Sequence, residues 1–547
     1  MKEVTKLGRW RLAALLAVVA WLAPAGSTWD GGAVADTAPP PPLLPATAGF
    51  HLGERLPADP AEVADFFTSP VQLPASRDRL WRAVDSALAR GKSGRVGVHV
   101  RELHDTRVDS AFDTASAPGL SIGSTVFARH ADDPFILASN TKLFTTAAVL
   151  DAFGPGHLIE TRLMVRGEVE GGRLDGDLAV VGAGDPTFSW RLDPDGDSGL
   201  VFHAWADDLA AAGIGAIDGD LFLDHSLFDA PLTHPGWKPE NELKWYQAPV
   251  SPFAFHENTV KVKAAPGPRP GTPARLAAEP DLALVPVDGQ VSTAASWRGA
   301  HLLVRRAEGG GIAVDGGVYH RGAEVEMPVA IEDPVAYFGA AMTAAFAERG
   351  VEVSGRVRAV SPRPGLVWRP LAVHRTPLLD LLEVTNHESQ NLFAETLTKL
   401  LGAERCGAGS WERGVMAVEE LARRRGVEGP GFDLADGSGL ARANRATPRQ
   451  VTGFLAGMAR HPHRDAWLVT LPTGGETATS LEKRLDVGPY PGRVYAKTGT
   501  LDGVSALSGY ARGRSGRVYA FSVLAAGSVG HARRVQDAVV RAIIDHG

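Results

Sequence analysis

The chain has 547 residues, of which 44% are hydrophobic and 22% are charged, an ordinary composition for a globular protein. This length is enough for about three domains of ~150 residues each. The net charge of −7 and the lack of a basic stripe argue against a nucleic-acid-binding protein. Cys406 is the only cysteine, which excludes an intrachain disulfide.

The N-terminal segment is typical of an export signal. Basic side chains precede a short apolar run at 13–26, and the small residues 33–35 form a candidate cleavage site. The basic residues are Lys2, Lys6, Arg9 and Arg11. We predict a signal peptide at 1–35, a Pro-rich tether at 36–70, and export to the periplasm or the extracellular cell-wall space. The alternative is an uncleaved signal anchor, which would be the chain's only contact with a membrane.

Helix and strand patterns follow the tether. Residues 76–91 carry apolar side chains at helical spacing after a candidate cap, Ser76, and predict a helix. Residues 95–103 alternate valine with other residues, as a strand does. A second helix is predicted at 141–154. From 160 to about 365, short alternating segments cut by Gly and Pro predict a β-rich region with few long helices.

Helical patterns return after the β-rich region. They cover 377–402 and 410–426, and three strands and a helix follow them. The strands are expected at 493–500, 503–512 and 517–526, and the helix at 531–545. The pattern predicts an α/β domain that is split by a long β-rich insertion.

An S-x-x-K motif lies where the helix at 141–154 begins. Residues three apart on a helix share a face, so Lys142 is expected beside Ser139. A serine hydroxyl needs a base to take its proton, and a lysine amine acts as that base only when burial or neighbouring cations lower its pKa. Taken alone, the pair could equally be a capped, solvated helix start. We expect that simpler structure for the second match, Ser480 and Lys483.

Two later motifs make the first more specific. Ser389-x-Asn391 lies in a helix-to-helix region within 377–402, and Lys497-Thr498-Gly499 lies on a predicted strand. Each match is short and weak by itself. The order S-x-x-K, S-x-N, K-T-G is the serine acyl-transfer set of penicillin-binding proteins and β-lactamases.

On these motifs the chain resembles the D-alanyl-D-alanine carboxypeptidase/endopeptidase group of low-molecular-weight class C penicillin-binding proteins (peptidase family S13). The resemblance runs from about 75 to the end. The stretches that carry it are 137–150, 182–188, 387–402, 436–448 and 496–510. Leu137 and Ala441 depart from the usual proline and serine, but neither replaces a catalytic group.

The resemblance implies an α/β (α+β) fold, a transpeptidase domain like that of penicillin-binding proteins and serine β-lactamases, with an antiparallel sheet and a helical subdomain. This domain would consist of 71–164 and 366–547. Two inserted β-rich domains at 165–365 would separate its halves. We hypothesise that the inserted domains position the protein on the cell wall or on partner proteins.

The resemblance also implies catalytic roles. Ser139 would attack the D-Ala-D-Ala carbonyl and become acylated, and Lys142 would take its proton. Ser389 would relay a proton to the leaving amine. Asn391 would hold the substrate amide and orient Lys142.

The K-T-G stretch would bind the substrate. Lys497 and the hydroxyls of Thr498 and Thr500 would hold the terminal carboxylate, and Gly499 would let the strand lie close to the substrate. The backbone N–H groups of Ser139 and Thr500 would form an oxyanion hole, each lowering the barrier by roughly 3 kcal/mol. The implied partners are peptidoglycan peptides and β-lactam antibiotics, with no nucleic acid, metal or cofactor.

Three other functions remain as alternatives. A β-lactamase would share the acylation step, but no E-x-x-L-N loop follows Asn391, and 240–243 is only a partial match. A non-catalytic wall-binding relative would keep the fold. An esterase would use Ser121 in the G-x-S-x-G match at 119–123. Residues 436–440 belong either to the site or to a simple turn.

Overall fold

The computed structural model describes residues 60–63, 65–67, 76–89, 94–105, 120–121, 123–193, 195–360 and 367–547. The predicted signal peptide at 1–35 lies outside these residues. Across the described ranges, no helix has both the length and the apolar character needed to span a bilayer.

An antiparallel sheet joins segments from the two ends of the described chain. Its strand order is β19 (Val494–Leu501), β20 (Val504–Arg512), β21 (Val518–Ala526), β1 (Arg95–Asp105) and β2 (Leu120–Ser121), and β3 (Thr125–Arg129) also pairs with β1. Arg95 pairs with Ala526 and Leu103 with Val518. The first long strand therefore lies beside the last one, as a domain split by an insertion requires.

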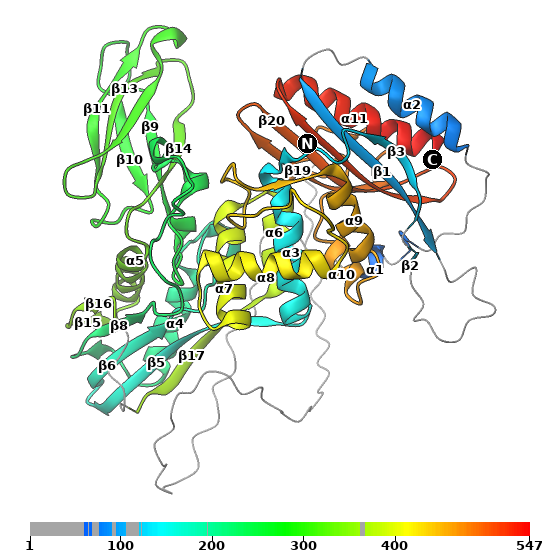
Figure 1. Cartoon of the computed structure of the whole chain (residues 1–547). Coiled ribbons are helices and arrows are strands. Elements are labelled where there is room, and N and C mark those ends of the chain that lie inside the picture. The colour runs from blue at the N-terminus through cyan, green and yellow to red at the C-terminus, as the bar shows by residue number, and fades with distance from the viewer. Residues whose placement is uncertain are drawn as a thin grey trace, which may run out of the picture. The chain divides into compact units, whose positions relative to one another are not determined.

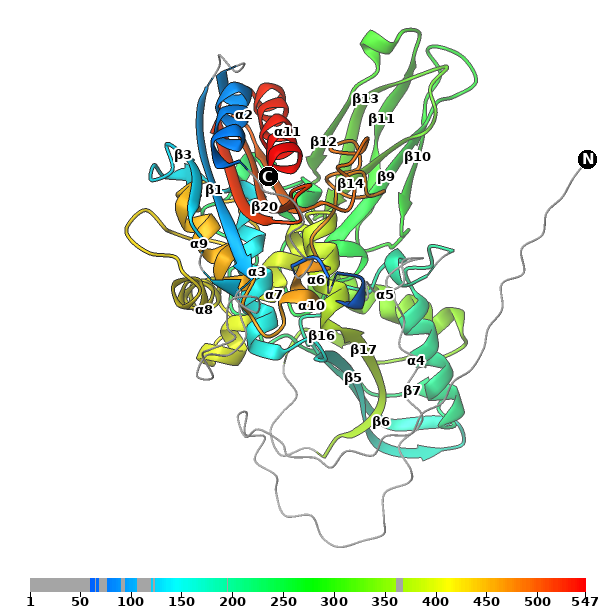
Figure 2. The same ribbon diagram turned by 90° about the vertical axis from the view of Figure 1, so that its right-hand side faces the viewer.

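Two helices cover one face of this sheet. α2 (Arg77–Ala89) and α11 (Val529–His546) lie side by side against it (Figures 1 and 2). The backbone N–H of Arg79 donates to the Ser76 hydroxyl at 3.3 Å, so Ser76 caps α2 as its position predicts. Side chains one turn apart on α2 are buried against the sheet, and they include Leu80, Val84 and Leu88.

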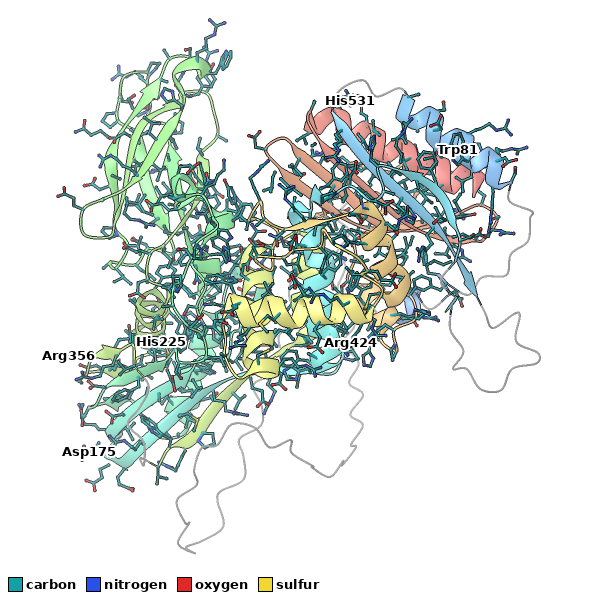
Figure 3. All side chains as sticks on the ribbon, viewed as in Figure 1. Trp81, Asp175, His225, Arg356, Arg424 and His531 are labelled. Atoms are coloured by element: carbon teal, nitrogen blue, oxygen red, sulfur yellow. The ribbon has the colours of Figure 1, made fainter. Side chains whose placement is uncertain are left out.

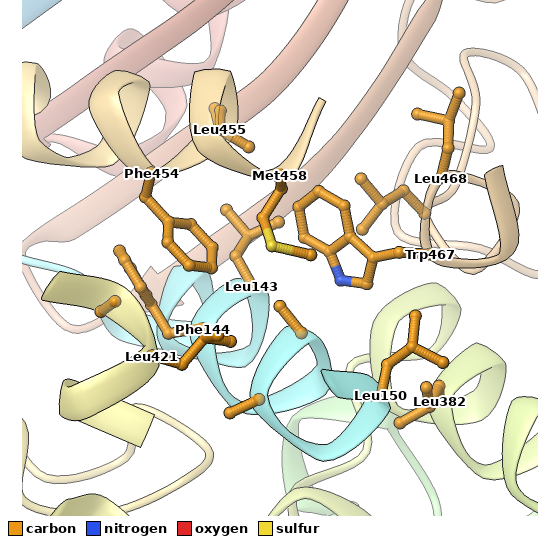
Figure 4. Close-up of a cluster of buried hydrophobic side chains, with 14 of the residues drawn as sticks. Leu143, Phe144, Leu150, Leu382, Leu421, Phe454, Leu455, Met458, Trp467 and Leu468 are labelled. Carbon is orange, nitrogen blue, oxygen red and sulfur yellow. The ribbon is translucent and has the colours of Figure 1, made fainter. Parts of the chain in front are cut away.

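A layer of helices packs on the other face. It comprises α3 (Thr141–Phe153), α6 (Leu378–His387), α7 (Asn391–Cys406), α8 (Trp411–Arg424), α9 (Pro448–Met458) and α10 (Arg464–Leu468). α3 is buried over its first ten residues, which fits a central helix. Phe144 of α3 meets Phe454 of α9 and Leu421 of α8 in the core between these helices (Figure 4). The predicted S-x-x-K motif therefore lies at the start of a helix that is buried over its first ten residues.

The region between the two halves is rich in strands, as predicted. A seven-stranded sheet contains β5 (Leu158–Glu170), β6 (Arg173–Val181), β7 (Ala216–Ile217), β8 (Leu221–Asp224), β15 (Glu352–Val353), β16 (Val357–Arg358) and β17 (Arg369–Pro377). α4 (Leu200–Ala211) and α5 (Pro334–Glu348) share its core. Because β5 starts before 165 and β17 follows 365, this sheet extends past both expected ends of the insertion, 165–365.

Two smaller sheets complete this region. One contains β9 (Thr259–Ala265), β10 (Arg275–Glu279) and β14 (Val325–Ala330), and the other β11 (Val287–Ala294), β12 (Leu302–Arg306) and β13 (Ile312–Tyr319).

Charged side chains lie on the outer surfaces of the protein. Examples are Asp175 and Arg356 at the seven-stranded sheet and Arg424 on α8 (Figure 3).

The expected tether, 36–70, extends too far toward the C-terminus. Its last described part includes the short helix α1 (Pro60–Val63) and the buried residues Phe66 and Phe67. The ring of Phe66 lies 4.9 Å from that of Tyr495, and the ring of Phe67 5.2 Å from that of Tyr510. Aromatic side chains bury a large apolar surface, so this piece packs on the domain that contains β19 and β20.

Candidate active site

The nucleophile candidate lies on a tight turn that leads into α3. Ser139 belongs to a 3₁₀ turn (Ala138–Asn140) and is half-buried. Ala138 has a left-handed φ of 46°, which is uncommon for a residue with a side chain. The side-chain Nδ2 of Asn140 donates to the carbonyl oxygen of Lys497 at 2.8 Å. The turn that carries Ser139 is thereby tied to strand β19.

Lys142 lies one turn after Ser139 and faces it. Its Nζ is 3.3 Å from Ser139 Oγ, 2.7 Å from Asn391 Oδ1 and 2.9 Å from the carbonyl oxygen of Ser438. The side chain is fully buried. Burial lowers the pKa of Lys142 to about 7, although the nearby carboxylates of Glu395 and Asp436 oppose the shift. An amine with this pKa is available as a base near neutral pH.

Ser389 and Lys497 form a second pair. Ser389 lies between α6 and α7 with a left-handed φ of 64°, and its Oγ accepts a 2.9 Å hydrogen bond from Lys497 Nζ. Lys497 is fully buried on β19. Burial, assisted by the charge of Lys142, holds the pKa of Lys497 well below its usual value. The three predicted motifs therefore meet around Ser139 although they lie far apart in the chain.

Asn391 connects Lys142 to the inserted region. While Oδ1 accepts from Lys142, Nδ2 donates to the carbonyl oxygen of Tyr246 at 2.8 Å. Tyr246 lies in the 3₁₀ turn Trp245–Gln247 of the inserted region. Every residue has a backbone carbonyl, so the residue type at 246 does not indicate this contact, and the sequence could not predict it.

The stretch 436–440 belongs to the site and is not a simple surface turn. Asp436 is buried and accepts hydrogen bonds from the backbone N–H groups of Gly439 and Ala441, at 2.7 and 2.6 Å. A Cβ at Gly439 would lie 1.8 Å from the carbonyl oxygen of Ala138. The turn therefore packs directly on the nucleophile's own turn, and only glycine fits there.

A buried carboxylate supports this turn. Glu395, one turn after Asn391 on α7, accepts from the backbone N–H groups of Gly437 and Ser438, at 3.0 and 2.8 Å, and from Trp411 Nε1 at 2.8 Å. Burial, followed by the charge of Asp436, raises the pKa of Glu395 to about 7. Sequence reasoning missed Glu395. Its only signal was a charged residue four positions after Asn391, on the same helix face.

β19 borders the nucleophile. A Cβ at Gly499 would lie 2.8 Å from the carbonyl oxygen of Leu137 and 3.1 Å from the backbone nitrogen of Ser139. Gly499 therefore lets the strand approach the nucleophile's turn. Thr500 is exposed, and its hydroxyl accepts from Arg533 Nη2 at 3.2 Å. Arg533, on α11, is a further residue that sequence reasoning missed.

An open pocket of about 860 Å³ lies over these groups. Its walls include six of the eight predicted residues, while Lys142 and Lys497 lie buried beneath it. The six are Ser139, Ser389, Asn391, Thr498, Gly499 and Thr500. Basic side chains outnumber acidic ones in the lining: Lys238, Arg442, Lys483, Arg484 and Arg533 against Glu388, Glu482 and Asp502. The pocket therefore suits a substrate with a negative charge.

Two of the competing motifs, both within the described residues, lack this arrangement. Ser480 and Lys483 lie in a series of turns at the edge of the pocket and share no helix face. Glu240, in the partial β-lactamase match, is 68% exposed beside Lys238. The side chain of Ser121, the nucleophile of the esterase alternative, lies outside the described part of the structure.

Comparison with known proteins establishes the family of this chain. The model of the D-Ala-D-Ala carboxypeptidase 3 (S13) family matches residues 102–544. This chain belongs to the S13 family. A D-alanyl-D-alanine carboxypeptidase of Actinomadura sp. (strain R39) is 31% identical over 525 residues, which are 91% of this chain and 92% of that protein. The S13 membership makes this chain a serine peptidase and confirms the family resemblance seen in its motifs.

Solved structures confirm the fold expected for an S13 peptidase. Penicillin-binding protein 4 (DacB) from Haemophilus influenzae superposes with a TM-score of 0.71 at 24% identity, covering 83% of this chain and 97% of that one. A second structure of that protein, in complex with a β-lactam, gives a TM-score of 0.67. At this identity the likeness establishes the fold alone.

Proposed function

We propose that this protein removes the terminal D-alanine from peptides that end in D-Ala-D-Ala, through an ester on Ser139, and that β-lactams acylate the same serine. One observation carries the assignment of the nucleophile: a buried lysine amine with a pKa of about 7 lies 3.3 Å from Ser139 Oγ. The names of the S13 relatives support the choice of substrate.

The reaction follows from this geometry. Ser139 Oγ attacks the carbonyl carbon of the penultimate D-Ala while Lys142 takes its proton. The backbone N–H groups of Ser139 and Thr500 stabilise the oxyanion. As the C–N bond breaks, the proton that Lys142 took passes through the Ser389 hydroxyl to the nitrogen of the leaving D-Ala, and Lys142 becomes neutral again. Water then attacks the ester, Lys142 again acts as the base, and Ser139 regains its proton.

The substrate's carboxylate would bind at β19. Lys497 contributes a buried amine beneath the site, and Thr498 and Thr500 contribute hydroxyls in the pocket wall. Asn391 orients Lys142 through its 2.7 Å hydrogen bond. A cross-linked peptide differs from this substrate only in its leaving amine, so we extend the proposal to endopeptidase activity on cross-links.

We further propose that the protein is exported and acts in the periplasm or the extracellular cell-wall space. The basic and apolar pattern of residues 1–35 supports this proposal, as does a peptidoglycan substrate. N-terminal sequencing of the mature protein from cell fractions tests it, because cleavage near 35 is expected.

Release of D-alanine from a peptide ending in D-Ala-D-Ala tests the activity. The full chain should release it, and Ser139→Ala should not. Ser480→Ala is the matched control, since it removes a pocket-lining serine that has no proposed role in the reaction and should retain activity. Activity that survives Ser139→Ala but is lost in Ser121→Ala would favour the esterase alternative instead.

A further inference from the structure

Ser389 has a conformation that must be held by its surroundings. It is a non-glycine residue with a φ of 64°, between the end of α6 and the start of α7. This region of backbone space is unfavourable for residues with a side chain and persists where neighbouring contacts over-determine it. The conformation matters because it places Ser389 Oγ 2.9 Å from Lys497 Nζ.

Both neighbours of Ser389 are held by side chains from the inserted region. Gln390 donates through Nε2 to Glu257 Oε2, while its Oε1 accepts from the backbone N–H of Leu392 at 3.1 Å and so caps α7. Glu388 pairs with Arg191 Nη1 at 2.8 Å. Arg191 Nε donates to Glu257 Oε1. A continuous hydrogen-bond network around Ser389 therefore links four side chains: Gln390, Glu257, Arg191 and Glu388.

Glu257 is itself presented by an unusual turn. His256, Glu257 and Asn258 all have left-handed φ values, of 50°, 55° and 53°. The side chain of Asn258 secures this turn, because Oδ1 accepts from the N–H of Phe255 at 3.2 Å and Nδ2 donates to the carbonyl of Pro249 at 2.9 Å. A costly local conformation is thus maintained where it directs a carboxylate at Gln390.

Burial raises the free-energy cost of breaking these hydrogen bonds. Glu257 is 6% exposed and Gln390 is 3% exposed. Loss of its hydrogen-bond partner is strongly unfavourable for a buried carboxylate or amide. Movement of the loop 388–390 would break several of these buried hydrogen bonds at once, so the network resists such movement. Arg191 adds a packing contact, since its guanidinium lies 5.8 Å from the ring centre of Phe393 on α7.

We propose that Glu257 and Arg191 are positioning residues for the proposed acyl-transfer reaction: they hold the 388–390 loop so that the Ser389 hydroxyl stays at Lys497. The inserted region would then be part of the catalytic apparatus, whatever its role in contacts with the wall. This inference rests on the proposed function, because Ser389 matters only if Ser139 is acylated.

An exchange of two side chains tests the proposal. Gln390→Glu keeps an oxygen that can cap α7 but places a second carboxylate against that of Glu257. Glu257→Gln removes the carboxylate oxygen that accepts from Gln390. We expect each variant to lower the rate constant for acylation by benzylpenicillin at least tenfold, with the dissociation constant of the non-covalent complex changed less than twofold. The double variant, Glu257→Gln with Gln390→Glu, restores a donor opposite an acceptor and should recover to within about threefold of wild type.

Controls distinguish a loss of Ser389 positioning from a loss of folding stability and from an incorrect proposed function. Glu348→Gln removes an inserted-region carboxylate that pairs with His203, far along the chain from the loop, and should acylate normally. Melting temperatures are measured for every variant. Wild-type rates in both single variants would overturn the proposal, as would a double variant that regains its melting temperature but not its acylation rate. A wild-type protein that benzylpenicillin does not acylate at Ser139 would instead refute the proposed function.

Discussion

The amine of Lys142 and the carbonyl oxygen of Ser438 lie 2.9 Å apart, and the backbone N–H of Ser438 is held by Glu395. The position of the proposed base therefore depends on a buried turn that is not part of any of the three motifs. Since the same turn packs on Ala138, it connects the base and the nucleophile's turn.

Acylation should depend on pH through Lys142. A protonated amine cannot accept the Ser139 proton, and the pKa of Lys142 is about 7. The rate of acylation by benzylpenicillin should rise about tenfold per pH unit below about pH 7 and level off above it. In Lys142→Arg this pH dependence should disappear and the acylation rate should fall by about 10²–10⁴-fold, because guanidinium does not release its proton. A flat wild-type profile between pH 5 and 9 would exclude Lys142 as the base.

Glu395→Gln should move this profile to lower pH. The Glu395 carboxylate raises the pKa of Lys142, so its removal lowers that pKa. The variant also leaves a buried N–H unpaired, which should cost about 1–3 kcal/mol in the free energy of unfolding. Glu404→Gln, an exposed site on the same helix, is the control and should change neither quantity. An unshifted profile in Glu395→Gln would contradict the electrostatic coupling.

Glu395 should also make stability depend on pH. Its pKa is raised to about 7 in the folded state, from 4.5 in the unfolded chain. The folded protein therefore binds more protons between pH 4.5 and 7, and Glu395 contributes stability that is lost as the pH rises through this range. Thermal unfolding across this range should show a flatter dependence in Glu395→Gln than in wild type. Equal slopes would mean that Glu395 is ionised throughout.

Gly439→Ala should impair acylation through a clash. Gly439 has a φ of 87°, and an added Cβ would meet the Ala138 carbonyl at 1.8 Å. Gly429 is the matched control, since its φ is 77° but an added Cβ would meet no atom within 4 Å. Both variants carry the cost of a left-handed alanine, about 1–2 kcal/mol. Only Gly439→Ala should also reduce the acylation rate, by more than tenfold. Equal kinetics in both variants would show that the contact with Ala138 is not needed.

Arg533→Ala should weaken binding of the substrate carboxylate. Arg533 lines the pocket and donates to the Thr500 hydroxyl. Since the site is exposed, we expect a rise of about three- to tenfold in KM for a peptide with a free C-terminus. Arg534→Ala removes the neighbouring exposed arginine and should leave KM unchanged. An equal effect in both variants would indicate a general charge effect.

Much of the fold was predictable because its elements carry strong local patterns. The strands at 494–501, 504–512 and 518–526 and the final helix lie within a few residues of their predicted positions. The motif residues were identifiable because their side chains perform the chemistry. Ser438 and Tyr246 contribute backbone carbonyls, which no residue type reveals. Glu395 and Glu257 act through long-range packing, which local patterns do not encode. Asp436 was ambiguous because Asp-Gly and Ser-Gly also form ordinary turns.

The most direct test is time-resolved intact-mass spectrometry of the full chain with benzylpenicillin, beside Ser139→Ala. We expect a long-lived adduct of one penicilloyl group in the wild type, mapped to Ser139 by peptide analysis, and no adduct in Ser139→Ala. Rapid turnover of the antibiotic with no accumulated adduct would point to a β-lactamase. An adduct that persists in Ser139→Ala would contradict the assignment of Ser139 as the nucleophile.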